Sequence, residues 1–164
     1  MAHRITALLI VGPHDTAAAE RFDLRPVPLT AELTLFHLDH YFTAYWQAAT
    51  GTTERLDVPA AVPSTFPAEG VVCRMARELT GAEAPTFALV MTDYFGGVGG
   101  QWACVFHGAQ RLSADDASIN DALRALGVTR TGGQDEFDTV GLGRHRRSPE
   151  HLHRYVDLCE ELGV

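Results

Sequence analysis

Two apolar runs on either side of a glycine cluster constrain the fold of this chain more than any other feature. Residues 87–94 read Phe-Ala-Leu-Val-Met-Thr-Asp-Tyr, residues 101–107 read Gln-Trp-Ala-Cys-Val-Phe-His, and four glycines lie between them. Two strand-like runs joined by a glycine-rich segment predict a β-hairpin, and we interpret the glycines as a wide hairpin loop. Both runs are apolar at consecutive positions, so both faces of the hairpin must be covered. We therefore expect helices on both faces of the sheet, or a second copy of the protein against one face.

The remaining segments alternate between strand and helix patterns. Strands are predicted at residues 4–11, 33–38 and 137–142 from apolar runs or period-two alternation. Helices are predicted at 16–24, 40–50, 67–80, 114–126 and 149–162 from their spacing of apolar residues and from capping residues. The cap of the fourth helix is assigned to Ser113-Ala114-Asp115-Asp116, which resembles a capping box.

These elements predict a single α+β domain over residues 1–164. The expected sheet is mixed, with about five strands, a central antiparallel hairpin and about five helices packed on it. A length of 164 residues fits one domain. Residues 51–67 carry three prolines and no periodicity, and we interpret them as an irregular surface connection.

Charge and composition exclude several classes of function. All 13 basic residues are arginine, against 21 acidic residues, for a formal net charge of −8. This balance argues against a general nucleic-acid binder, and the absence of lysine excludes Schiff-base and P-loop lysine chemistry. Lysine-free, alanine-rich sequence is typical of a GC-rich genome, so we expect a bacterial source. No apolar run is long enough to span a membrane, and three cysteines without paired spacing indicate a reducing, cytoplasmic location.

Residues 37–40 form the most reactive-looking cluster. His37 and Asp39 would share one face if a strand ran through them, and His40 opens the following helix. A carboxylate beside an imidazole can fix its tautomer and raise its basicity, as a general base requires. The alternative is that Asp39 is only the N-cap of the helix and that His40 faces solvent.

Arg144, Arg146 and Arg147 form a basic cluster directly before the last predicted helix. Arginine charge beside a helix N-terminus favours a small anion such as phosphate or carboxylate. The alternative is a solvated loop that pairs with the nearby acidic residues Asp135, Glu136 and Asp138.

Aromatic residues gather in two places. Tyr41, Tyr45 and Trp46 belong to one predicted helix, whose apolar arc is broader than a single core contact requires. Tyr94 and Trp102 flank the glycine cluster. Because Tyr and Trp are favoured at interfaces, these five residues are candidate binding residues, with core packing as the alternative for the helix.

The first functional hypothesis is a non-catalytic protein-interaction domain, which forms a homodimer or acts as an acidic binder or inhibitor of another protein. The alternative is a small hydrolase-like enzyme that uses His37, Asp39 and His40 on an anionic substrate. A weaker alternative is a metal site formed by His14, His37 and His40, although no metal-ligand spacing is present. No cofactor fingerprint is present either, so no cofactor is expected.

Overall fold

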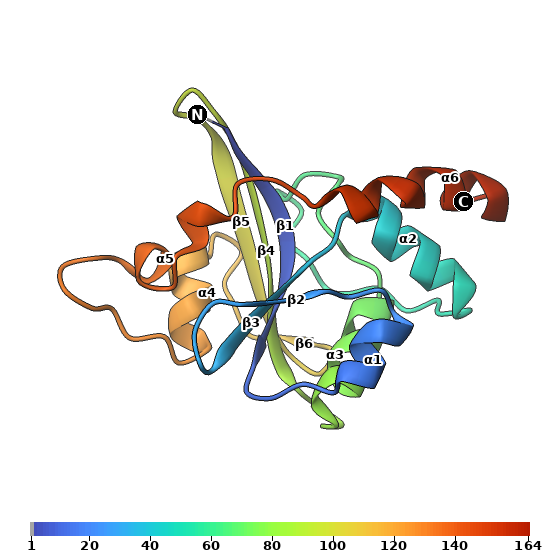
Figure 1. Ribbon diagram of the computed structural model, residues 1–164, viewed down its shortest axis with the longest axis horizontal. Helices are drawn as coiled ribbons and strands as arrows, with labels where there is room; N and C mark the ends of the chain where they lie inside the picture. Colours follow the sequence, from blue (N-terminus) through green and yellow to red (C-terminus); the bar gives the residue numbers. More distant parts are fainter. Residues whose placement is uncertain (1) are drawn as a thin grey trace.

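A computed structural model describes residues 2–164 and contains a six-stranded sheet between two groups of helices (Figure 1). The strand order is β2-β3-β1-β4-β5-β6, and every neighbouring pair is antiparallel. The strands are β1 (His3–Val11), β2 (Pro26–Pro28), β3 (Leu33–His37), β4 (Thr86–Phe95), β5 (Val98–His107) and β6 (Gln110–Arg111). The α+β class is confirmed, with six strands in place of about five and antiparallel pairing in place of a mixed sheet.

The helices divide between the two faces of the sheet. One face carries α1 (Thr16–Arg21), α2 (His40–Ala49), α3 (Val71–Thr80) and α6 (Arg154–Leu162). The opposite face carries α4 (Ile119–Ala125) and α5 (Glu136–Thr139). Two short 3₁₀ helices, η1 (Leu142–Arg144) and η2 (Glu150–His153), lie in the segment that leads to α6. None of the helices among residues 2–164 is long and apolar enough to cross a membrane.

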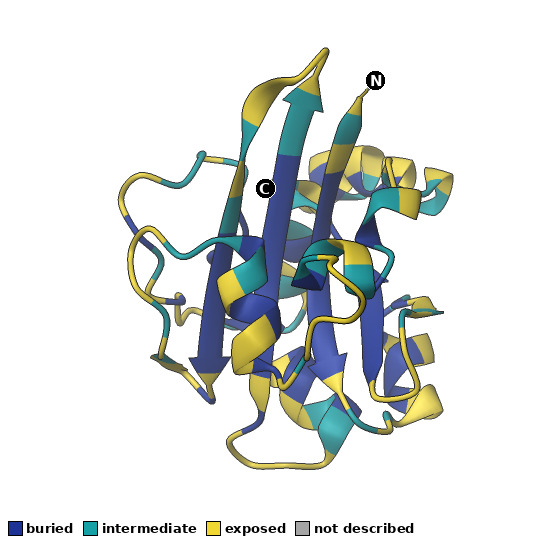
Figure 2. Cartoon of the chain, turned by 90° about the vertical axis from the view of Figure 1, so that its left-hand side faces the viewer, coloured by how far each residue is buried: buried dark blue, intermediate teal, exposed yellow. Residues whose placement is uncertain are grey.

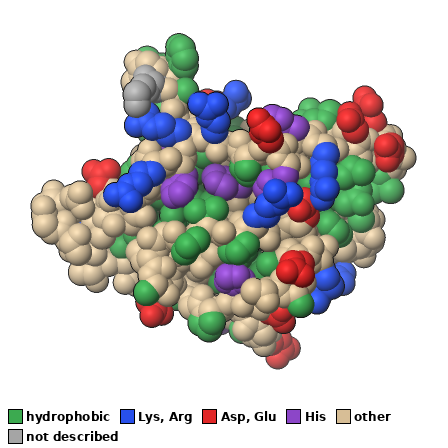
Figure 3. Space-filling view, viewed as in Figure 1, with side chains coloured by type: hydrophobic (Ala, Val, Ile, Leu, Met, Phe, Trp, Pro, Cys, Tyr) green, Lys and Arg blue, Asp and Glu red, His purple; other side chains and the backbone are tan. Residues whose placement is uncertain are grey.

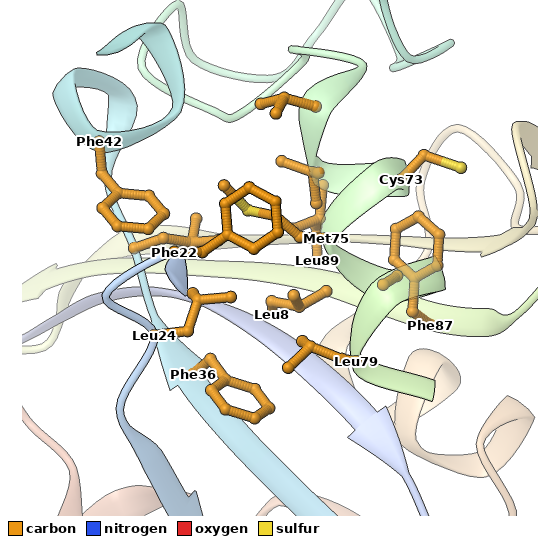
Figure 4. Packing of buried hydrophobic residues seen from close by; sticks show 14 of the residues in the cluster. Leu8, Phe22, Leu24, Phe36, Phe42, Cys73, Met75, Leu79, Phe87 and Leu89 are labelled. Atoms are coloured by element: carbon orange, nitrogen blue, oxygen red, sulfur yellow. The ribbon is translucent and has the colours of Figure 1, made fainter. Parts of the chain in front are cut away.

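Alternation along the strands builds a separate core on each face. Leu8 and Leu89 belong to the larger cluster under α1, α2, α3 and α6, which Figure 4 shows in close-up. Leu9 and Val90, one residue further along each strand, belong to the smaller cluster under α4 and α5. Figure 2 shows the middle of the sheet as buried. Helices therefore supply the cover on both faces that the two-sided apolar strands require.

The β4–β5 hairpin is tighter than predicted. Its turn is only Gly96-Gly97, with φ angles of 60° and 81°, so both residues adopt the left-handed conformation that a two-residue hairpin turn favours. Gly99 lies within β5, at φ 150°, where an added Cβ would come within 1.8 Å of the Asp93 carbonyl oxygen. The expected wide loop is thus wrong, because two of the four glycines belong to the strand and permit a close backbone approach.

Two local predictions in the second half of the chain are wrong. Residues 137–142 are not a strand: Asp135 caps a helical turn by accepting a hydrogen bond from the Asp138 N–H at 2.8 Å. The capping box of α4 is formed by Ser118 and Asp121 rather than by Ser113–Asp116. In both places the helix begins directly after a residue whose side chain caps it, Asp135 for α5 and Ser118 for α4. Residues 51–67 contain no helix and no strand of the sheet.

Candidate functional site

The end of strand β3 divides the cluster predicted at residues 37–40. His37 is the last residue of β3 and lies opposite Ala7 of β1, on the sheet face that carries the smaller core cluster. Asp39 and His40 follow the strand and line a cleft that His37 does not reach. No hydrogen bond among the described residues joins His37 to Asp39. The predicted pair of base and orienting carboxylate is therefore not formed.

His37 is a buried histidine with an incomplete set of hydrogen bonds. Its side chain is only 7% exposed, and its Nδ1 has no partner in the structure. The centre of its ring lies 6.4 Å from that of His145, and Figure 3 shows histidine side chains gathered across the middle of this view. Burial, with smaller contributions from His145 and His151, lowers the pKa of His37 to about 4. His37 is therefore neutral near pH 7.

Asp39 acts as the cap of helix α2. Its Oδ1 accepts a hydrogen bond from the Phe42 N–H at 2.8 Å, which satisfies one of the free donors at the helix N-terminus. His40, the first residue of α2, packs its ring against that of Tyr41, with centroids 4.1 Å apart. The structure thus shows the capping role for Asp39 that was the alternative to catalysis.

A cleft lies beside Asp39, close to several of the predicted site residues. It has a volume of about 520 Å³ and lies among β1, the start of α2 and the segment before α6. Its polar lining includes Arg4, Thr6, Asp39, His40, Arg147, Ser148, Glu150 and His153. The cleft therefore brings residues from two clusters predicted far apart in sequence, 37–40 and 144–147, to one place.

The lining of this cleft carries charges of both signs. Two arginines and two carboxylates line it, and Arg4 also faces Asp93 at 3.6 Å. The Thr6 side chain is 7% exposed and forms no hydrogen bond with the described residues, so its hydroxyl is free to bind a ligand. Neither His40 nor His153 is hydrogen-bonded to a carboxylate among residues 2–164.

The predicted basic cluster is split by the local backbone. Arg147 lines the cleft, Arg146 accepts a hydrogen bond from the Arg4 N–H through its backbone carbonyl at 2.8 Å, and Arg144 ends η1. The alternative pairing with neighbouring acidic residues does not form among residues 2–164, and Glu136 lies within 4 Å of Arg124 and Arg130 instead. Within residues 2–164, the three arginines of the cluster make no ion pair.

Most of the aromatic side chains of α2 pack against residues of α1 and α6, or directly after α1. The Trp46 ring lies 5.3 Å from Phe22, and the Tyr45 ring lies 5.4 Å from the buried Tyr155 of α6. Both Tyr45 and Trp46 are half-buried by these contacts. Tyr41 is the exposed aromatic of the helix and lines the cleft. The packing therefore matches the core interpretation for Tyr45 and Trp46.

Tyr94 and Trp102 stand at the base of a projecting hairpin end. The β4–β5 hairpin extends beyond the body of the protein (Figures 1 and 2), and its tip residues Phe95 and Val98 are 78% and 79% exposed. The Trp102 ring lies over Gly100, where an added Cβ would be 2.8 Å from the ring. Gln101 Nε2 donates to the Tyr94 hydroxyl at 3.4 Å. The two predicted residues are thus close to an exposed apolar tip.

A cavity lined by arginines was not found from the sequence. Arg55, Arg74 and Arg77 line a hollow of about 360 Å³ between helix α3 and the loop that follows α2. Arg74 and Arg77 are three residues apart on one helix, which signals a shared face. Arg55 lies about twenty positions earlier in an irregular loop, and nothing in the sequence places it beside them.

The weaker metal hypothesis finds no support in the geometry. His14 packs edge-on against Phe36, with ring centroids 5.3 Å apart, and Phe36 belongs to the larger core cluster, on the face opposite to His37. In the part of the chain that the structure describes, no group of three histidine, cysteine or acidic side chains is placed to hold a metal ion.

No protein-family model matches the chain, and neither a curated protein nor a solved structure matches it.

Proposed function

We propose that the protein is a non-catalytic interaction domain that forms a homodimer through the outer edge of β5 and the hairpin tip. The contrast between the two edges of the sheet carries this proposal. The edge at β2 contains Pro26 and Pro28, which cannot donate backbone hydrogen bonds to a further strand. The edge at β5 has no proline, and β6 covers only its last two residues.

Backbone groups along the open part of β5 are available for pairing. Val105 directs its N–H to the Ser113 hydroxyl and its carbonyl to the Leu112 N–H, both away from β4. Because this direction repeats every second residue in an antiparallel strand, Gln101 and Gly99 direct their groups the same way. No strand of the described structure lies beside them. A second strand could add to the sheet at this edge.

The charge distribution favours a second copy as the partner. The protein carries a net charge of −8, so two copies repel one another over most surfaces. Residues 94–106 contain no charged side chain, so the hairpin end can meet its own copy without opposing like charges. An antiparallel pair of identical edges is self-complementary about a two-fold axis. Phe95 and Val98 of each copy would then be removed from water.

Light scattering coupled to size-exclusion chromatography tests this proposal. We expect a mass of twice the 17.8 kDa chain in the micromolar range, and dissociation on Val98→Glu or Phe95→Glu, because either change places charges of the same sign at the two-fold contact. Leu162→Glu is the matched control, since Leu162 is also exposed but lies at the end of α6. A chain that stays monomeric over a wide concentration range would refute the homodimer.

A small anion beside Arg147 is a second candidate, and the convergence of Arg147, Thr6 and Tyr41 on one cleft favours it. A monovalent carboxylate attached to an apolar group fits this lining best, because Asp39 and Glu150 would repel a more highly charged anion. Titration with benzoate, followed by amide NMR signals, should shift the signal of Thr6 in the wild type. That shift should disappear in Arg147→Gln; if it persists there, Arg147 does not hold the anion.

A cytoplasmic location is the third part of the proposal. Cys73, Cys104 and Cys159 are all free and buried, and burial raises the pKa of each thiol. Thiols of this kind are unreactive and fit a reducing compartment. Mass spectrometry of the protein isolated from its source cells under alkylating conditions should find all three thiols reduced.

A further inference from the structure

The geometry points to a binding site for a small phosphate-bearing molecule in the cavity lined by Arg55, Arg74 and Arg77, called here the arginine cavity. Its volume of about 360 Å³ lies in the range of small-molecule sites. Two of the arginines come from helix α3 and the third from the loop after α2. The site is independent of the hairpin end and of the cleft beside Asp39, with which it shares no lining residue.

The positive charge around this cavity is only partly compensated. Arg55 and Arg77 make no ion pair with any carboxylate in the described range, residues 2–164. Arg74 does contact Glu78 at 3.1 Å, but Glu78 also contacts Arg21 at 3.1 Å, so one carboxylate serves two guanidinium groups. The three arginines line one hollow, and a bound anion would offset their positive charge.

The frame of the arginine cavity is fixed by backbone contacts. The Gly70 N–H donates to the Glu54 carbonyl at 2.9 Å, and the Leu56 N–H donates to the Ala68 carbonyl at 2.7 Å. The approach at Gly70 is so close that an added Cβ would lie 2.5 Å from the Glu54 oxygen. Arg77 is itself held by a hydrogen bond from its Nε to the Glu83 carbonyl at 2.8 Å. A preorganised set of donors loses less entropy when a ligand binds.

The donor set suits an oxyanion such as phosphate. Guanidinium groups donate pairs of parallel hydrogen bonds that match the oxygens of phosphate. Glu54 is the one acidic residue that lines this cavity, whereas Asp39 and Glu150 both line the cleft beside Arg147. A long polyanion would be repelled by the rest of a chain with net charge −8. A small molecule with one or two phosphoryl groups therefore fits best.

Isothermal titration calorimetry with inorganic pyrophosphate tests the site. We expect the double variant Arg55→Gln/Arg77→Gln to weaken binding at least about tenfold, because it removes two of the three charged donors that line the cavity. Arg144→Gln/Arg146→Gln changes the net charge equally at residues outside the cavity, and its affinity should stay within about twofold of the wild type. The single variant Arg55→Gln, at an exposed side chain without an ion pair, gives the same test if the double variant fails to fold.

Three results would overturn the assignment. They are the absence of pyrophosphate binding to the wild type, equal weakening in the two double variants, and loss of binding in the Arg144→Gln/Arg146→Gln variant alone. The second result would mean non-specific attraction to positive charge. The third would move the site to the cluster before helix α6.

Discussion

Protonation of His37 should make this protein unstable in mild acid. The side chain lies at the end of β3, is 7% exposed, and leaves its Nδ1 without a partner. A charged imidazole there would lose its hydration without gaining an acceptor, and for this reason the pKa falls from 6.5 to about 4. At about 1.4 kcal/mol per pH unit, the full difference corresponds to about 3 kcal/mol of unfolding free energy.

The direction in which stability changes with pH follows from proton binding to His37 in the folded and the unfolded chain. Between about pH 6.5 and 4 the unfolded chain holds a proton on His37 and the folded chain does not. The unfolding free energy therefore keeps its full value above pH 6.5 and decreases as the pH falls toward 4. Between about pH 7.5 and 5, His37 alone should remove about 2 kcal/mol. Burial also lowers the pKa of His151, which adds to the loss in the same direction.

Urea unfolding followed by circular dichroism at about pH 7.5 and 5 measures this loss. His37→Gln should reduce the pH-dependent part of the loss by about 2 kcal/mol, even though the variant is less stable at every pH, because glutamine does not titrate in this range. His153→Gln is the control at an exposed histidine and should leave the loss unchanged. If His37→Gln keeps the pH dependence of the wild type, the burial of His37 does not cause the acid sensitivity.

Two further predictions concern local structure. Asp39→Ala should lower the unfolding free energy by about 1 kcal/mol through loss of the α2 cap, whereas Asp39→Ser should restore most of it; urea unfolding at neutral pH measures both. Gly99→Ala should destabilise the hairpin by more than about 2 kcal/mol, because its Cβ would overlap the Asp93 carbonyl. Gly143→Ala, whose Cβ would meet only Phe137 at 3.8 Å, is the control and should change the melting temperature little; equal shifts in both variants would contradict the steric argument.

The sequence predicted elements well where a long apolar pattern and a cap agreed. Strand β1 has the long apolar pattern, and helix α2 begins at its cap, Asp39, at the predicted residue. Residues 137–142 alternate over only six positions, and a cap from Asp135 competes with that pattern. Strand β2 was missed because its three residues include two prolines, which usually argue against a strand. The conformation of a short segment depends more on the elements packed against it than on its own pattern of apolar and polar residues.

The candidate sites were predicted less completely than the elements, for a geometric reason. Residues close in sequence separate when a strand ends between them: His37 faces one layer of the sheet, while Asp39 and His40 line a cleft outside it. Residues distant in sequence, such as Arg55 and Arg77, meet only because the loop after α2 folds back beside α3.

Recognising the open edge of β5 requires both the amino-acid sequence and the order of the strands in the sheet. The uncharged run from Tyr94 to Phe106 is visible in the sequence, and it would suit a central strand equally well. Only the strand order places this run near the edge of the sheet, where β6 covers just Phe106 and His107. Edge strands usually carry charge or proline that prevents association, as β2 does with Pro26 and Pro28. An edge that lacks both, in a protein whose opposite edge is protected, is therefore the surface at which association is expected first.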